Sequence, residues 1–157
     1  MLKKSTWERH VNPWSVWTRV PLLPLFALVV FLRGPLGGWT WLLLAALFGW
    51  TLINPKAFPP PALTDSWASR GVLGERVWLN RKAVPIPPHH ARWALGLSLA
   101  TGLFLIPLIW GLYALDPWAT ALGAIGASMA KLWFIDRMVW LYQDMQDATP
   151  EYAGWLR

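Results

Sequence analysis

The sequence predicts an all-α membrane protein: a four-transmembrane-helix bundle with a cytoplasmic interfacial cap between helices 2 and 3. The chain of 157 residues is 55% hydrophobic and only 14% charged, whereas charged residues make up about a quarter of a typical soluble domain. Its apolar residues fall in four long runs, separated by prolines, glycines and charges. We expect residues 1–157 to form a single membrane domain.

The four spans are expected at about residues 13–32, 36–53, 91–115 and 117–142, with the cap over residues 54–90. A bilayer core requires about 20 helical residues. The last two spans reach this length easily, and the first two reach it only with their flanks.

Capping residues and prolines mark the ends of these spans. Asn12-Pro13 and Asp116-Pro117 each place a capping side chain before a proline, a pattern typical of a helix start. Asn54-Pro55 is expected to end the second span, because proline disfavours helix in the residue before it. The prolines within spans are expected to kink them; these are Pro21, Pro24 and Pro107.

The amino end also has the basic region and apolar stretch of a signal peptide. Pro21 and Pro24 interrupt that stretch, and no small-residue cleavage pattern precedes Arg33. We therefore expect the first helix to be retained.

The basic residues predict the orientation. All but one of the 14 lysines and arginines belong to the amino end, the central segment, or the last span and tail; the exception is Arg33 in the first hairpin. The positive-inside rule places the basic side in the cytoplasm. We therefore expect a multi-pass protein of the inner (plasma) membrane with both termini cytoplasmic. The net charge of +6 fits flanks that contact anionic lipid, and no nucleic-acid partner is expected.

The 14 tryptophans support the same boundaries. Tryptophan concentrates at both membrane interfaces. Those near the proposed inner boundary are Trp14, Trp17, Trp50, Trp93, Trp133 and Trp140, and those near the outer boundary are Trp39, Trp41, Trp110 and Trp118.

Small residues predict how the last two spans pack. At four-residue spacing they are Ala94, Ser98 and Gly102 in the third span, and Ala119, Gly123 and Ala127 in the fourth. Such seams let helices approach closely in lipid, and the short connection predicts an antiparallel hairpin. Lys131 continues the second seam and is expected to point into it. A lysine there is either functional or extends toward the interface.

The cap is expected to contain two short helices that lie on the inner membrane face. Thr64-Asp65-Ser66, followed by Gly71, predicts a capped first helix, and residues 72–80 can form the second. Proline-rich connectors flank them at residues 58–61 and 84–88.

Polar side chains collect at the expected inner side and form what we call the polar belt. In a structural interpretation, its arginines pair with carboxylates and its tryptophans anchor helix ends. In a binding interpretation, it holds a lipid head group, a small ligand or a partner subunit. The residues expected to bind are Arg76, Arg81, Arg92, Arg137, Trp133, Trp140 and Asp144.

The alternative is a membrane-embedded enzyme at the same belt. Its catalytic candidates are His89, His90, Asp136 and Glu75, and its metal-ligating candidates are His10, His89 and His90 with Asp136, or with Asp144 in its place. Imidazole and carboxylate suit a divalent metal ion, and no other cofactor is suggested. Adjacent histidines on a helix point about 100° apart, which disfavours joint ligation. The absence of cysteine excludes thiol chemistry.

A transporter is a third interpretation, with less in its favour. Four spans are few, no inverted repeat is detectable, and only Lys131 would lie at depth. Assembly as a homo-oligomer or with another membrane subunit would supply further helices. The sequence thus leaves both enzymatic and binding roles open.

Several stretches resemble a family of small prokaryotic integral membrane proteins that carry a domain of unknown function. They are NPWSVWTR at residues 12–19, INP at 53–55, FPPP at 58–61, WAS at 67–69, VLGERVWLNR at 72–81, PIP at 85–87 before His89-His90, and KLWFIDRMVWLYQDM at 131–145. The resemblance covers about residues 8–146. It implies a compact multi-span membrane protein and no established activity.

Overall fold

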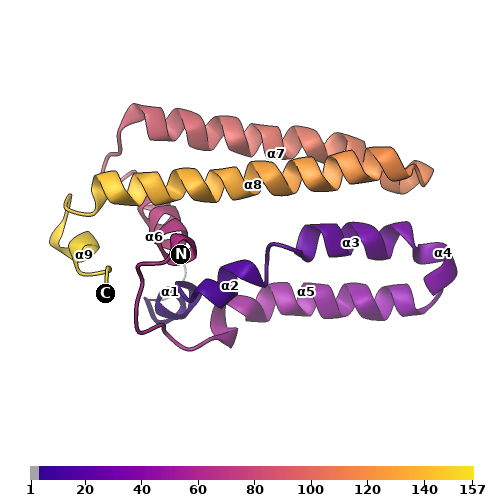
Figure 1. Cartoon of the computed structure of the whole chain (residues 1–157), viewed down its shortest axis with the longest axis horizontal. Helices are drawn as coiled ribbons and strands as arrows, with labels where there is room; N and C mark the ends of the chain where they lie inside the picture. The colour runs from indigo at the N-terminus through magenta and orange to yellow at the C-terminus, as the bar shows by residue number, and fades with distance from the viewer. Residues whose placement is uncertain (1–3) are drawn as a thin grey trace.

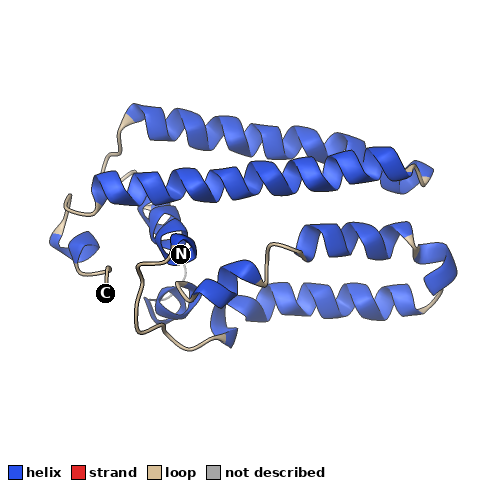
Figure 2. Ribbon diagram, viewed as in Figure 1, coloured by secondary structure: helices blue, strands red, loops and turns tan. Residues whose placement is uncertain are grey.

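The computed structural model describes residues 4–157 and is 76% helical, with no strand in this part of the chain (Figure 2). The expected all-α class is confirmed. The helices are α1 (Lys4–His10), α2 (Pro13–Trp17), α3 (Leu22–Phe31), α4 (Arg33–Leu36), α5 (Trp39–Ala57), α6 (Trp67–Leu79), α7 (Pro88–Ala114), α8 (Pro117–Met145) and α9 (Pro150–Ala153).

Two antiparallel helix pairs lie side by side (Figure 1). The first pairs α3 with α5 through α4, and the second pairs α7 with α8 through a tight turn. Both turns lie at the same end of the molecule, which we call the hairpin end. The opposite end, where α1, α6 and α9 lie, we call the cap end. The antiparallel α7–α8 hairpin expected from the short connection is present.

Three segments are long and apolar enough to cross a membrane: Pro13–Phe31, which α2 and α3 form together, and the whole of α7 and α8. Most of their surface is left uncovered by the protein, since only 28%, 17% and 39% of their most apolar stretches are buried. Leu95, Ile106 and Ile109 of α7 are each more than 60% exposed. These features are those of a multi-pass membrane protein. The 19-residue α5 is not among these three segments, and it ends in Asn54, Pro55 and Lys56.

The expected helix starts are present. The side chain of Asn12 accepts a hydrogen bond from the Trp14 N–H at 3.0 Å at the start of α2. Asp116 accepts one from the Ala119 N–H at 2.7 Å at the start of α8. Each side chain satisfies a backbone donor that has no partner within its helix.

The first span is divided rather than kinked. Residues 18–21 form a turn between α2 and α3, with Pro21 as the cap of α3. Pro24 lies in the first turn of α3, where a missing N–H removes no intrahelical bond. Pro107 lies inside α7, which continues past it.

The second span was expected to end at Asn54-Pro55, and this prediction is wrong. α5 continues through Pro55 to Ala57. Asn54 is fully buried. Its side-chain amide bonds Ser15 and Thr18 of the first span. These bonds hold the last turn of α5 in place despite the following proline.

The cap contains one helix instead of the two expected. α6 continues through Gly71, because Gly71 and Gly74 are contact points with α8 rather than helix ends. A Cβ atom at Gly74 would overlap the carbonyl oxygen of Met138. α6 therefore crosses α8 with its backbone in direct contact (Figure 1).

The α7–α8 seam follows the prediction for α8 and departs from it for α7. Gly123 packs on the backbone of Leu108, and Ala127 is fully buried. On α7, however, Ser98 and Gly102 are exposed. A step of four residues rotates by about 40° around a helix with 3.6 residues per turn, so the expected face turns away from the seam. The buried positions are instead Ala94, Leu97, Leu108 and Gly111.

The main apolar core lies at the cap end. It joins α1, α2, α6, the start of α7 and the end of α8, with Val77, Met138 and Leu141 completely buried. Tyr152 of α9 closes this core, and its hydroxyl accepts a hydrogen bond from Asn80 at 2.8 Å. Nearer the hairpin end, a small cluster of Ala27, Leu108 and Ala124 joins α3 to the α7–α8 hairpin.

Candidate functional site

A cleft of about 240 Å³ lies between the α2–α3 segment and the helices α6, α7 and α8. Its polar lining consists of His10, Arg19, Glu75, Thr101, Ser128 and Lys131. Its apolar lining includes Val16, Val20, Leu23, Val72, Leu132 and Ile135. The cleft therefore combines charged groups with apolar walls contributed by candidate membrane spans.

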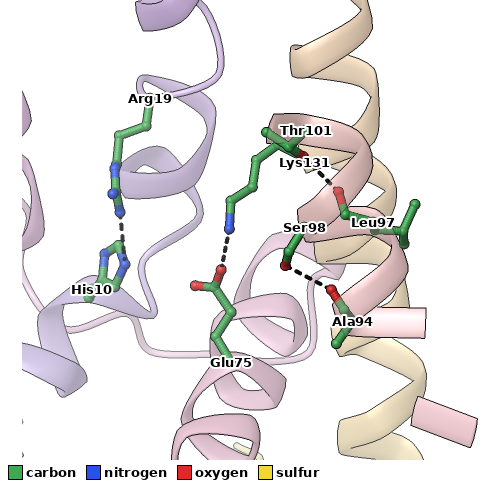
Figure 3. A network of polar contacts seen from close by, with 8 residues as sticks. All are labelled: His10, Arg19, Glu75, Ala94, Leu97, Ser98, Thr101 and Lys131. Carbon is green, nitrogen blue, oxygen red and sulfur yellow. Dashed lines mark hydrogen bonds and ion pairs between the residues drawn. The ribbon is translucent and has the colours of Figure 1, made fainter. Parts of the chain in front are cut away.

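Lys131 pairs with Glu75 across the cleft. Its Nζ atom lies 2.8 Å from Glu75 Oε1 (Figure 3) and 4.3 Å from the centre of the Phe134 ring. The side chains of Lys131 and Glu75 are 53% and 24% exposed. Lys131 thus reaches from α8 toward the cap helix α6, rather than into the α7–α8 seam where the sequence placed it.

Opposite this ion pair, His10 faces Arg19 (Figure 3). Arg19 Nη1 donates to His10 Nε2 at 3.1 Å, which leaves the proton on Nδ1 to be donated to Ser15 Oγ at 2.7 Å. Ser15 donates to Asn54 Oδ1, and Asn54 donates to Thr18 Oγ1, each at 2.8 Å. This chain of hydrogen bonds runs in one direction through groups that are mostly buried.

His10 is held as a neutral imidazole. Burial lowers the pKa of His10 to about 4; Arg19 and Lys131 lower it too, against the opposing effect of Glu75. Both ring nitrogens are occupied, so His10 is available neither as a base nor as a metal ligand. With His10 neutral, the cleft carries Arg19, Lys131 and Glu75, a net charge of one positive unit. Arg19 has no carboxylate within ion-pair distance among residues 4–157.

A second group of polar side chains lies where α7 begins and α8 ends. His90 Nε2 lies 2.8 Å from Asp144 Oδ2, and His89 Nε2 lies 3.9 Å from the same oxygen. The two imidazole centres are only 4.1 Å apart. Rotation about the side-chain torsions thus overcomes the separation of about 100° that had counted against joint ligation.

The structure does not bring the whole expected metal set together. Among the described residues, the only cluster of histidine, cysteine or carboxylate side chains with metal-ligand spacing is His89, His90 and Asp144. His10 is engaged in the cleft. Asp136 accepts a hydrogen bond from Trp67 Nε1 at 2.9 Å and so anchors α6 to α8.

Two of the expected binding arginines have structural contacts in the cap. Arg76 pairs with Glu151 at 2.8 Å and lies 3.9 Å from the centre of the Trp155 ring. Arg81, which follows the end of α6, lies 3.8 Å from the centre of the Trp78 ring. These contacts hold the carboxyl-terminal segment and the end of α6.

The remaining members of the belt form an exposed aromatic surface. Arg137 lies 5.1 Å from the ring centre of Trp93 and 5.6 Å from that of Trp140. Trp133 packs on Trp93 at 5.6 Å, and Arg92 is exposed. Tryptophan rings around a cation are typical of a membrane interface.

Sequence reasoning missed Arg19, Ser15 and Asn54 as members of the site. Arg19 had counted only as a charge that sets orientation. The available indication was Asn54 itself, since an amide at the end of an apolar run requires hydrogen-bond partners when it is buried. Ser15 and Thr18 lie on the facing segment and supply them.

No curated protein matches the chain, and no solved structure matches it. One family does match, over residues 1–155, and it is described as a family of unknown function, DUF6653. The match covers nearly the full length and includes every element that lines the cleft. The chain therefore belongs to the DUF6653 family of unknown function.

Proposed function

We propose that the protein is a four-span protein of the inner membrane with both termini in the cytoplasm. α5 would be the fourth span, paired with α3 and flanked by exposed Trp39 and Trp41 at the hairpin end. The cap end would then face the cytoplasm. The basic residues support this orientation, because Arg33 is the one lysine or arginine near the hairpin end.

We further propose that the cleft binds the head group of an anionic lipid. The observation that carries this proposal is Arg19, a cation without a carboxylate partner among the described residues, beside an apolar wall. One phosphate oxygen could accept hydrogen bonds from the guanidinium nitrogens that His10 does not use. Lys131 would add a second positive group on the opposite side.

The size of the cleft fits part of a lipid. Pockets for drug-sized ligands have volumes of about 300–1,000 Å³, and this cleft has about 240 Å³. It would hold a head group or the upper part of one acyl chain along Val20, Leu23 and Leu132, while the rest of the lipid stays in the bilayer. At the cap end, such a lipid would belong to the cytoplasmic leaflet, where anionic lipids concentrate.

The cleft favours binding over catalysis. His10 uses both ring nitrogens, and Glu75 is paired with Lys131. No other imidazole or carboxylate lines the cleft among the residues that the structure describes. A general acid–base mechanism requires a group that is free to exchange a proton with substrate.

Native mass spectrometry tests the lipid proposal. The protein would be purified in mild detergent with phosphatidylglycerol added, and separately with phosphatidylcholine. We expect one phosphatidylglycerol to be retained by the wild type and lost in Arg19→Gln. Leu23→Trp should also reduce retention, because it fills the cleft without changing a charge.

Arg92→Gln is the matched control, since it removes one exposed positive charge outside the cleft. We expect it to retain the lipid. Equal retention of phosphatidylcholine, or unchanged retention in both Arg19→Gln and Leu23→Trp, would contradict the proposal. A second protein that co-purifies in place of lipid and is lost in Leu23→Trp would instead support a partner subunit.

Reporter fusions test the orientation. A reporter after Arg157 should report the cytoplasm, and one inserted between Gly37 and Gly38 should report the opposite side. A periplasmic result for the first fusion would place the cap end outside. It would also overturn the assignment of the cleft to the cytoplasmic leaflet.

A further inference from the structure

The geometry points to a binding site for one divalent transition-metal ion, of which zinc is the best match, formed by His89, His90 and Asp144. This inference is independent of the proposed lipid site, because the two sites share no residue. It follows from the antiparallel packing of α7 on α8, which places the first turn of α7 beside the last turns of α8.

The distances match tetrahedral coordination. Zinc binds imidazole nitrogen and carboxylate oxygen at about 2.0–2.1 Å, so that two ligand atoms on a tetrahedral ion lie about 3.3 Å apart. The two distances from Asp144 Oδ2, 2.8 Å to His90 and 3.9 Å to His89, lie on either side of that value. All three donor atoms fall within 4.8 Å of one another. Small side-chain rotations would therefore complete the geometry.

The burial pattern is that of a site with one fixed ligand and two accessible ones. The side chain of His90 is 2% exposed, while those of His89 and Asp144 are 50% and 51% exposed. An ion could reach the site from water, and a fourth position would remain for a water molecule. Three protein ligands with an open position are typical of accessible zinc sites.

An ordinary ion pair explains the cluster less completely. One histidine is enough to pair with Asp144, yet the second imidazole also turns its Nε2 toward the same oxygen. The Nδ1 atom of His90 is buried without a hydrogen-bond partner, so Asp144 is the polar partner of this ring among the described residues. Asp144 has no lysine or arginine partner among the described residues, and its charge remains available to a cation.

The donor set indicates which ions would bind. Two imidazoles and one carboxylate suit zinc and its neighbours in the first transition series better than calcium or magnesium, which prefer oxygen ligands. A bound ion would join the start of α7 to the end of α8. Since it would bind the folded protein and not the unfolded chain, it would raise stability.

Calorimetric titration tests the site. Purified protein in mild detergent would be stripped with EDTA and titrated with Zn²⁺, and with Co²⁺ for its absorption spectrum. We expect one ion per chain and a spectrum of tetrahedral cobalt. His89→Ala and Asp144→Asn should each weaken binding by at least about tenfold. His89→Ala leaves the half-buried His90–Asp144 contact in place, so its fold should persist.

Asp147→Asn is the matched control, because Asp147 is an exposed carboxylate near the end of α8 outside the cluster. We expect it to bind zinc as the wild type does. The inference is overturned if the wild type binds no stoichiometric zinc, or if His89→Ala and Asp144→Asn bind as tightly as Asp147→Asn. Lipid retention measured on the same samples separates the two proposals, since His89→Ala should keep the lipid and Arg19→Gln should keep the metal.

Discussion

Lys131 Nζ lies 2.8 Å from Glu75 Oε1, so the one charged residue in the middle of α8 is neutralised from the cap helix α6. The pair lies where α6 crosses α8, beside the close contact of Gly71 with Ile135. A charge in a membrane span is costly unless it has a partner or reaches the interface. Here the partner comes from the element that covers the cap end, so the packing of α6 and the placement of Lys131 depend on each other.

Removal of Glu75 should therefore destabilise the protein. Glu75→Gln leaves Lys131 without its carboxylate, and we expect a loss of about 2 kcal/mol in the free energy of unfolding, between the values for exposed and buried pairs. Lys131→Met in the same chain should recover most of it, because no unpaired charge remains. Chemical unfolding in lipid-free detergent measures both changes.

Glu151→Gln provides the comparison for that experiment. It breaks the pair with Arg76, in which the Glu151 side chain is 63% exposed, so we expect a loss below about 1 kcal/mol. If Glu151→Gln lowered the free energy of unfolding as much as Glu75→Gln, loss of the carboxylate partner would cost no more in the cleft than at the exposed Arg76–Glu151 pair.

Stability should fall as the solution is acidified through the range set by His10. Burial lowers the pKa of His10 from 6.5 to about 4 in the folded protein, whereas the unfolded chain keeps the ordinary value. The unfolded state therefore binds more protons between these two values, and stability rises with pH. The contribution is complete above about pH 6.5 and is lost as the pH falls toward 4; it amounts to at most about 3 kcal/mol.

His10→Gln isolates this contribution, because glutamine does not titrate and the carboxylates of the chain remain in both proteins. Unfolding free energies at intervals between pH 4 and pH 7.5 should converge for the two proteins at the acidic end. Parallel curves would show that His10 titrates as it does in the unfolded chain.

Much of the fold could be predicted because it depends on composition and local punctuation. The length of the apolar runs indicated α7 and α8, and Asp116-Pro117 marked the start of α8 where Asp116 now caps it. The errors arose where distant residues decide local structure. α5 does not end at Asn54, because Ser15 and Thr18 hydrogen-bond its side chain. α6 does not end at Gly71, because α8 packs directly against that glycine.

The site was less predictable for the same reason. The sequence predicts the depth of each residue in the membrane and so groups the polar belt into one layer. Depth alone does not determine which of these side chains are in contact. Within that layer, His89, His90 and Asp144 converge, while His10 turns to Arg19 and Asp136 to Trp67. These separations depend on the rotation of each helix about its axis, which packing determines. A four-residue pattern of small residues did not fix it even for α7, where Gly102 is exposed.

The crossing of α6 and α8 should tolerate no side chain at Gly74. In Gly74→Ala the added methyl group would overlap the carbonyl oxygen of Met138, which is backbone and cannot turn away. We expect the free energy of unfolding to fall by about 3 kcal/mol or more, at the upper end of overpacking effects. Gly96→Ala, at an exposed position of α7 with open space around it, should be neutral or gain up to about 1 kcal/mol. Chemical unfolding in detergent compares the two, and equal effects would contradict the α6–α8 contact.

Arg33, the exception to the charge asymmetry, should act as a cap for the opposite hairpin. Its Nη1 atom donates to the carbonyl oxygen of Leu112 at 2.7 Å, and to that of Val30 at 3.1 Å. Leu112 lies in the last turn of α7, where the carbonyls have no intrahelical partner, and Arg33 supplies a donor there. Arg33→Gln should therefore cost about 1 kcal/mol, the usual net value of a protein hydrogen bond, because the guanidinium is exposed. Arg33→Lys retains the charge but not the planar array of donors. Its stability should therefore lie between that of the wild type and that of Arg33→Gln in the same unfolding assay. If Arg33→Lys matches the wild type, charge alone accounts for the residue and the carbonyl contacts contribute nothing measurable.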